Sequence, residues 1–178
     1  MTYFRDLSRY SYLREETVAA ETVAAEGAYF AEFEPAYHRV NVGWLSGKHE
    51  YTSGPSPVEF LARLLDILSR QKINLTRGFH CCELCPYQER QAGLLAVEHK
   101  GAMVRLGNGE IRVPGAPKEV FAAPTLIAHY VERHHYLPPT SFVEAVLRCP
   151  EGWMSGPDAP GVPKSATRCD YRNRRRRA

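Results

Sequence analysis

The sequence predicts one α+β domain over residues 1–150, in which a small antiparallel sheet and about three helices are clipped together by one zinc site. Three observations support this expectation. The chain has 178 residues with 44% hydrophobic content, which is enough to bury one core. Short apolar runs with strand-like alternation are interleaved with amphipathic helical segments. Two cysteines spaced CxxC and two later histidines supply four ligands for one metal ion.

The first part of the chain predicts one strand preceded by an extended segment. Residues 39–45 alternate well enough for a strand, with Val40, Val42 and Trp44 on one face. Residues 6–13 are expected to be extended, with their tyrosines packed on the body of the domain. Between these segments the sequence ETVAA occurs twice, at 16–20 and 21–25. One short duplication is too little for a solenoid, so we expect a surface loop or a short helical turn there.

The clearest predicted helix begins near residue 57. Ser56 can cap it, Pro57 suits the first helical position, and Glu59 completes an SxxE capping box. An apolar stripe at helical spacing predicts a face that packs in the core, and this stripe consists of Phe60, Leu61, Leu64, Leu65 and Leu68.

The second half of the chain predicts a hairpin and two further helices. Residues 94–97 and 102–106 are predicted strands. The Gly-Asn-Gly-Glu stretch at 107–110 is expected to turn the second strand back into residues 110–113, because Asn-Gly tolerates positive φ. A second helix is predicted from near Pro124 to the histidines. A third short helix, from about Ser141 to Leu147, is expected to be capped by Thr140 or Ser141.

Residues 151–178 are predicted to form a disordered tail, because proline, glycine and arginine interrupt any apolar period there. The formal net charge of +3 is concentrated at this end. Five arginines occupy most of the last seven positions, and they are Arg172, Arg174, Arg175, Arg176 and Arg177. The rest of the chain is therefore close to neutral and is not a basic nucleic-acid platform. Only the arginine run offers nonspecific contacts to phosphates.

The metal ligands are chosen from a larger set of cysteines and histidines. We predict a Cys2His2 site for Zn²⁺ made of Cys82, Cys85, His129 and His134. Cys81 is excluded because, next to Cys82 in an extended stretch, it points to the opposite side. His80 is the first alternative ligand and His135 is the second.

The spacing of the two histidines constrains the helix that carries them. Positions five apart on an ideal helix are separated by about 140°. His129 and His134 can therefore reach one ion only if the helix tightens or ends near Arg133, and two prolines at 138–139 favour an ending. A redox-active CxxC would begin a helix after a parallel strand, whereas here Pro86 follows and favours a turn. A redox pair and a turn without metal are the alternatives.

A set of short motifs resembles an uncharacterised actinobacterial family. The motifs are FxDLSxYxY at 4–12, NVGWL at 41–45, TRGFHxCxxC at 76–85 and APTLIxHYVxxH at 123–134, and the resemblance covers roughly residues 2–146. In that family one residue separates the histidine of the third motif from the CxxC pair. This fits His80 and Cys82, and it implies that Cys81 and His135 are local substitutions. The resemblance implies no activity. The duplication at 16–25 and the arginine tail lie outside the shared pattern and are not expected to carry its function.

The leading functional prediction is a binding or regulatory module with a structural metal, because two thiolates and two imidazoles fill a tetrahedron and leave no position for water. An unidentified protein partner fits this interpretation. A zinc-dependent hydrolase is the first alternative, with Glu83 or Glu132 as general base beside an open metal position, although the HExxH pattern is absent. Nucleic-acid binding through the arginine tail is the second alternative.

A cytoplasmic location is expected, with no membrane partner. The N-terminus has no basic region followed by an apolar core. No apolar run approaches the roughly 18 residues of a membrane span. The five cysteines are an odd number and three of them crowd into residues 81–85, which suits a reducing compartment and a metal better than a disulfide framework.

Overall fold

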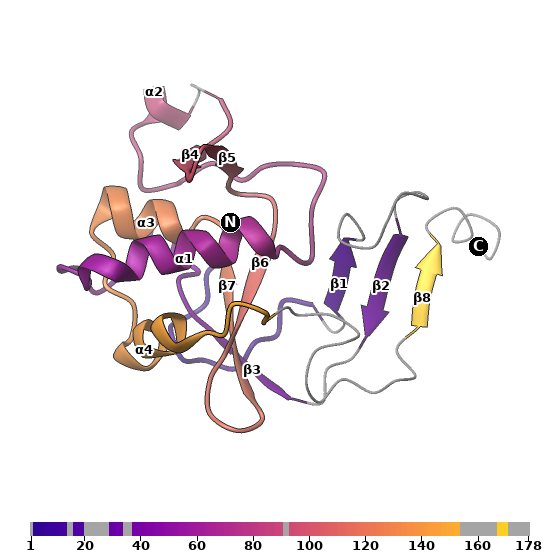
Figure 1. Cartoon of the computed structure of the whole chain (residues 1–178). Helices are drawn as coiled ribbons and strands as arrows, with labels where there is room; N and C mark the ends of the chain where they lie inside the picture. Colours follow the sequence, from indigo (N-terminus) through magenta and orange to yellow (C-terminus); the bar gives the residue numbers. More distant parts are fainter. Residues whose placement is uncertain are drawn as a thin grey trace.

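The computed structural model describes residues 2–13, 16–19, 29–33, 37–90, 93–153 and 167–170, and it has the predicted α+β architecture (Figure 1). The strands are β1 Glu16–Ala19, β2 Tyr29–Phe33, β3 His38–Asn41, β4 Ala96–His99, β5 Ala102–Arg105, β6 Glu110–Pro114, β7 Glu119–Pro124 and β8 Thr167–Asp170. The helices are α1 Val58–Arg70, α2 Tyr87–Arg90, α3 Ile127–His134 and α4 Thr140–Arg148. Residues 16–19 of the duplication form β1, so the loop or helical turn expected there is wrong. Residues 20–25 of the duplication and all five terminal arginines lie outside the described residues.

In the described part of the chain the strands form three small sheets, with the orders β1-β2-β8, β3-β7-β6 and β4-β5. Every pair is antiparallel, as predicted, except that β3 pairs with β7 in parallel. The expectation of a purely antiparallel sheet is corrected at this one pair. A parallel pair needs a long crossover connection, and the chain between β3 and β7 supplies one that includes α1.

The strand predicted at 39–45 is shorter than expected. β3 ends at Asn41. The Val42 N–H still donates to the Ala122 carbonyl of β7 at 3.0 Å, and residues 43–45 then leave the ladder but stay buried. Gly43 marks the exit, because its φ is 73° and a Cβ there would lie 2.7 Å from Ile127 Cδ1 at the start of α3. A side chain at this position would push the chain away from α3, so the glycine permits the close packing of the two segments.

The N-terminal strap, defined as residues 3–10, covers the outer edge of β3. Arg9 pairs with Val40 in an antiparallel bridge. The Tyr10 side chain is buried, and the ring centroids of Tyr10 and Tyr12 lie 6.3 Å and 5.3 Å from that of Trp44. The tyrosines of this segment therefore pack on the body of the domain, as predicted.

The hairpin turn predicted at 107–110 is wrong. β5 pairs with β4 and β6 pairs with β7, so residues 107–109 connect two different sheets. The turn between β4 and β5 is made instead by Lys100 and Gly101, whose φ angles are both positive, at 51° and 80°, as a tight two-residue hairpin requires. Residues 107–109 run beside residues 73–80, and the His80 N–H donates to the Gly107 carbonyl at 2.8 Å.

The core is built around α1, whose apolar stripe is buried as predicted except at Leu61, which is only partly buried. Phe60 and Leu64 are fully buried, and the ring of Phe142 on α4 lies edge-on to Phe60 with a centroid distance of 6.2 Å. The predicted caps are not formed. Pro57 and Pro139 are the N-cap residues of α1 and α4, and neither helix has a side-chain cap hydrogen bond, so the capping box at 56–59 and the cap at 140–141 are wrong. Among the described helices, none has the length and apolarity that crossing a bilayer requires.

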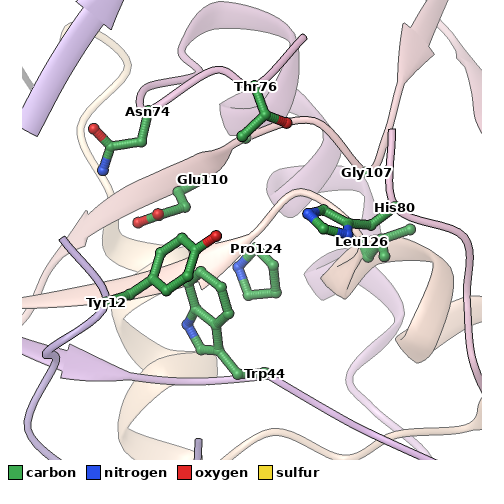
Figure 2. Close-up of a pocket in the computed structure, with 10 residues that line it drawn as sticks. Tyr12, Trp44, Asn74, Thr76, His80, Gly107, Glu110, Pro124 and Leu126 are labelled. Atoms are coloured by element: carbon green, nitrogen blue, oxygen red, sulfur yellow. The ribbon is translucent and has the colours of Figure 1, made fainter. Parts of the chain in front are cut away.

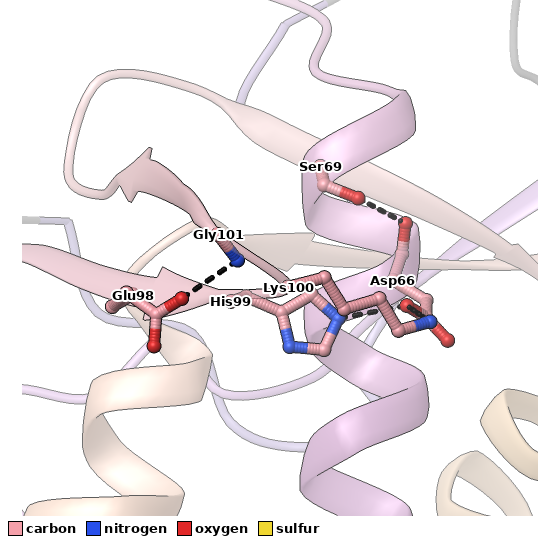
Figure 3. A network of polar contacts seen from close by, with 6 residues as sticks. All are labelled: Asp66, Ser69, Glu98, His99, Lys100 and Gly101. Atoms are coloured by element: carbon pink, nitrogen blue, oxygen red, sulfur yellow. Dashed lines mark hydrogen bonds and ion pairs between the residues drawn. The ribbon is translucent and has the colours of Figure 1, made fainter.

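A polar network anchors the β4–β5 hairpin to α1 (Figure 3). The Asp66 carboxylate on α1 lies 2.7 Å from His99 Nε2 and accepts a hydrogen bond from Lys100 Nζ at 2.6 Å. The Gly101 N–H donates to Glu98 Oε1 at 2.7 Å and closes the turn. Because both partners of Asp66 come from the tip of the hairpin, one carboxylate holds the hairpin against the helix.

Two described parts of residues 151–178 contact the rest of the chain. Trp153 packs against the core, and its Nε1–H donates to the Arg112 carbonyl at 3.1 Å. β8 pairs with β2. Residues 154–166 and 171–178 lie outside the described residues. The division of the chain at residue 150 and the disorder of the tail stay predictions.

Candidate metal centre

The two cysteines of the CxxC motif lie in a turn that neighbouring segments hold in place. Cys82 and Cys85 are buried, with 1% and 5% of their surface exposed. Pro86 follows them, and α2 begins at the next residue. On the other side, the Gly47 N–H lies 3.4 Å from Glu83 Oε2, and a Cβ at Gly47 would lie 3.2 Å from the Glu83 carbonyl oxygen. The motif therefore forms the predicted turn and does not begin a helix.

α3 carries both histidines, and it ends at His134, close to the position that their five-residue spacing predicts. His129 lies near the start of this helix, and His134 is its last residue. His135 then adopts a left-handed conformation with φ of 51°, and its N–H donates to the Tyr130 carbonyl. A left-handed residue of this kind is a common way to end a helix. The early ending lets two imidazoles that are five positions apart turn toward the same point.

The four predicted ligands are brought together. Cys85 Sγ lies 3.2 Å from His129 Nε2 and 3.3 Å from His134 Nε2, while Cys82 Sγ lies 3.2 Å from His134 Nε2. All four ligand atoms lie within 4.8 Å of one another. In a tetrahedral zinc site with ordinary bond lengths, a sulfur and a nitrogen ligand lie about 3.6 Å apart. The cluster could therefore hold a metal ion after only small side-chain shifts.

Cys85, His129 and His134 favour their neutral forms. Burial, reinforced by the neighbouring Cys82, raises the pKa of Cys85 to about 12. Burial lowers the pKa of His129 to about 4, with His134 as the second cause, and burial followed by Arg133 lowers the pKa of His134. Neutral imidazoles are the form that binds metal, whereas a thiolate needs a nearby cation to stabilise it. A divalent ion held by the four side chains would supply that charge.

The alternative ligands lie elsewhere. His80 lines a separate small pocket with Trp44 and Glu110 (Figure 2). His135 is exposed at the end of α3, and Cys81 is exposed beside the CxxC turn. Within the described residues, none of these three side chains joins the cluster.

Neither glutamate that the sequence offers as a general base belongs to the cluster. The Glu83 carboxylate faces the Gly47 N–H, and Glu132 is exposed on α3. In the part of the chain that the structure describes, the cluster consists of two thiols and two imidazoles, without a carboxylate. The hydrolase alternative therefore receives no support from the position of these two residues.

Two contacts that support α3 had no signal in the sequence. The Tyr51 hydroxyl donates to the His134 carbonyl at 3.3 Å, although the two residues are 83 positions apart. The Arg133 guanidinium lies 3.3 Å from the Glu89 carboxylate on α2. These contacts join the end of α3 to the loop after β3 and to the helix that follows the CxxC turn.

Comparison with other proteins gives a family without a known role. No curated protein and no solved structure matches the chain. A family model described as a domain of unknown function, DUF7919, matches residues 2–147. This range includes the CxxC turn and the whole of α3, so the candidate metal centre lies entirely inside it. Because the model covers most of the 178 residues, the chain belongs to the DUF7919 family.

Proposed function

We propose that the four converging side chains bind one Zn²⁺ and that this ion is a structural clip in a binding or regulatory module. The observation that carries the proposal is the approach of two sulfurs and two imidazole nitrogens to within 4.8 Å of one another. Zinc prefers this ligand set and takes it in tetrahedral geometry. Four protein ligands leave no coordination position for water, and closed sites of this kind are structural.

The ion would join two segments that are far apart in the chain. Cys85 and His129 are 44 positions apart, so one ion bound to both closes a long loop. Closing a long loop restricts the unfolded chain more than closing a short one, which stabilises the folded state. Removal of the metal is expected to loosen α2 first, because that helix has no buried residues and its contact with α3 is the exposed Arg133–Glu89 pair.

The same chemistry favours a reducing compartment, for which we propose the cytoplasm. Cys81, Cys82, Cys85 and Cys149 are all free thiols, and thiolate ligands persist where thiols stay reduced. The partner of the module is proposed to be another protein, because the sequence outside the terminal arginines is close to neutral.

Metal content in a matched pair of variants tests the ligand assignment. The full-length protein and Cys81→Ser are expected to carry stoichiometric zinc, whereas Cys85→Ser loses it. Cys85 contacts both imidazoles, while Cys81 is exposed beside the site. Elemental analysis of the purified proteins provides the measurement. Zinc retained in full by Cys85→Ser, or lost equally from Cys81→Ser, contradicts the assignment.

Cobalt substitution tests whether the site is closed. Co²⁺ in a Cys2His2 site is expected to give thiolate-to-metal absorption and the visible bands of a tetrahedral ion. Azide or phosphate should leave these bands unchanged, because no coordination position is open. Bands that shift on addition of a small anion would show an open position, and the hydrolase alternative would then replace the structural one.

A further inference from the structure

A cleft of about 670 Å³ lies beside the residues that follow α3. Three segments form its walls, namely residues 3–6 of the N-terminal strap, Leu45 with residues 50–52, and residues 137–140. None of the four proposed metal ligands lines it. Small-molecule sites in proteins typically have volumes of about 300–1,000 Å³. The size of the cleft therefore suits a small ligand.

Hydrogen bonds hold the three walls together. The Leu137 N–H donates to the Thr52 carbonyl at 2.9 Å and joins the second wall to the third. The Asp6 carboxylate accepts hydrogen bonds from the Gly43 N–H at 2.8 Å and from the Tyr136 hydroxyl at 2.7 Å, which attaches the strap. Both oxygens of Asp6 are engaged in this way. The cleft is therefore preformed, as ligand sites usually are.

The lining combines apolar surface with charged side chains of both signs. The apolar part comes from aromatic, leucine and proline side chains, namely Tyr3, Phe4, Leu45, Tyr51, Leu137 and Pro138. Arg5 and Glu50 also line the cleft, and with the described residues neither side chain forms an ion pair or a hydrogen bond. The third charged lining residue is Asp6, whose carboxylate is already hydrogen-bonded to Gly43 and Tyr136. Arg5, Glu50 and the apolar side chains therefore face the same space.

We propose that this cleft binds a small zwitterion with an apolar side chain, which is the charge pattern of an α-amino acid. The ligand carboxylate pairs with Arg5, its ammonium group pairs with Glu50, and its side chain packs against the apolar walls. A ligand that carries only one charge leaves one of the two protein charges without a partner. The two charges together thus decide selectivity.

Three probes of similar size separate the contributions of the two charges. L-phenylalanine carries both charges, 3-phenylpropionate carries only the anion, and 2-phenylethylammonium carries only the cation. Binding is followed by the backbone amide NMR shifts of the full-length, metal-loaded protein. L-phenylalanine is expected to shift signals of the cleft residues saturably and to bind about fivefold more tightly than either one-charge probe, which is the upper range for an exposed ion pair.

Charge-neutral variants assign each contribution to a residue. Arg5→Gln is expected to remove the advantage of L-phenylalanine over 2-phenylethylammonium, and Glu50→Gln its advantage over 3-phenylpropionate. Glu132→Gln, which is exposed on α3 and outside the cleft, is the control and should keep both advantages. All three positions are exposed, so the variants should unfold at the same temperature as the parent.

Three results would overturn the proposal. One is the absence of a saturable shift at cleft residues with L-phenylalanine up to about 10 mM, beyond the weak end of small-molecule affinity. Another is equal binding of the three probes to the parent protein. The third is binding that neither Arg5→Gln nor Glu50→Gln changes. If the protein lacks zinc but still binds L-phenylalanine, the proposal of a metal centre fails while the proposal of a ligand cleft stands.

Discussion

Gly107 lies between two closely packed backbone segments, one that leads to the CxxC turn and one that leads into α3. Its φ is 93°, and its N–H donates to the buried Thr125 Oγ1 at 2.8 Å. On its other side, a Cβ would lie 2.5 Å from the His80 carbonyl oxygen. The close approach places His80, and with it the following CxxC turn, against the segment that leads into α3.

Substitution of Gly107 by alanine is expected to lower the free energy of unfolding by about 1–3 kcal/mol, because the backbone is in a region that suits glycine and a carbonyl stands in the way. Gly78→Ala is the matched control, since no atom lies within 4 Å of its Cβ position and its φ is not positive. Its effect should stay within about 0.5 kcal/mol. Urea unfolding measures the free energy of unfolding of both variants. Equal losses in the two variants would contradict the role given to Gly107.

At the scale of elements, the contact between the β4–β5 hairpin and α1 depends on one carboxylate. Burial raises the pKa of Asp66, but hydrogen bonds from Lys100 and His99 outweigh it, so the pKa lies below the ordinary 3.8. A carboxyl with a lowered pKa stabilises the folded state above its unfolded pKa. This stabilisation is lost as the pH falls through the lower, folded-state pKa. The hairpin contact is therefore expected to weaken in acid.

Asp66→Asn is expected to lower the free energy of unfolding by about 1 kcal/mol at neutral pH. The difference from the parent protein should shrink as the pH falls below 3.8, because the parent carboxyl is then also becoming neutral. Glu144→Gln is the control, since Glu144 forms an exposed 3.2 Å pair with Arg148 within α4. Such pairs contribute only about 0.3–0.5 kcal/mol. Denaturant unfolding of both proteins across a pH series provides the measurement. A difference in the free energy of unfolding that does not change with pH would contradict the role of the Asp66 carboxylate in holding the hairpin.

At the scale of the whole molecule, distant parts of the chain meet around the buried β6 residue Arg112. Its guanidinium lies 2.7 Å from Glu110 Oε2, and the Tyr10 hydroxyl of the strap donates to Glu110 Oε1 at 3.0 Å. The Arg112 carbonyl accepts hydrogen bonds from Gln71 Nε2 after α1 and from Trp153 Nε1 after α4. The strap, α1 and the segment beyond α4 are therefore joined at one strand.

Trp153→Ala is expected to lower the free energy of unfolding by about 2 kcal/mol, which is less than the cost of removing a fully buried tryptophan because this side chain is only partly buried. Zinc content should not change, since Trp153 lies outside the ligand cluster. Tyr87→Ala is the control, because 66% of Tyr87 is exposed. If Trp153→Ala were as stable as the parent protein, the domain would end before Trp153, as a boundary at residue 150 implies.

The features that could be predicted from the sequence alone depend on residues close together in the chain. The stripe from Phe60 to Leu68 predicts the buried face of α1, because helical periodicity depends only on nearby residues. The candidate ligands could be selected for a similar reason. A CxxC turn brings two sulfurs together, and a helix that ends at His134 brings two imidazoles together. Each pair of ligands could therefore be predicted from residues close to it in the sequence.

The features that could not be predicted from the sequence depend on residues far apart in the chain. Residues 107–109 have the composition of a hairpin turn, yet they pass between residues 73–80 and Thr125 because both neighbours offer hydrogen bonds there. The parallel pairing of β3 with β7, the contact of Tyr51 with His134 and the three-walled cleft likewise join distant segments. Such contacts form only when the whole core packs. A pattern of neighbouring residues therefore cannot predict them.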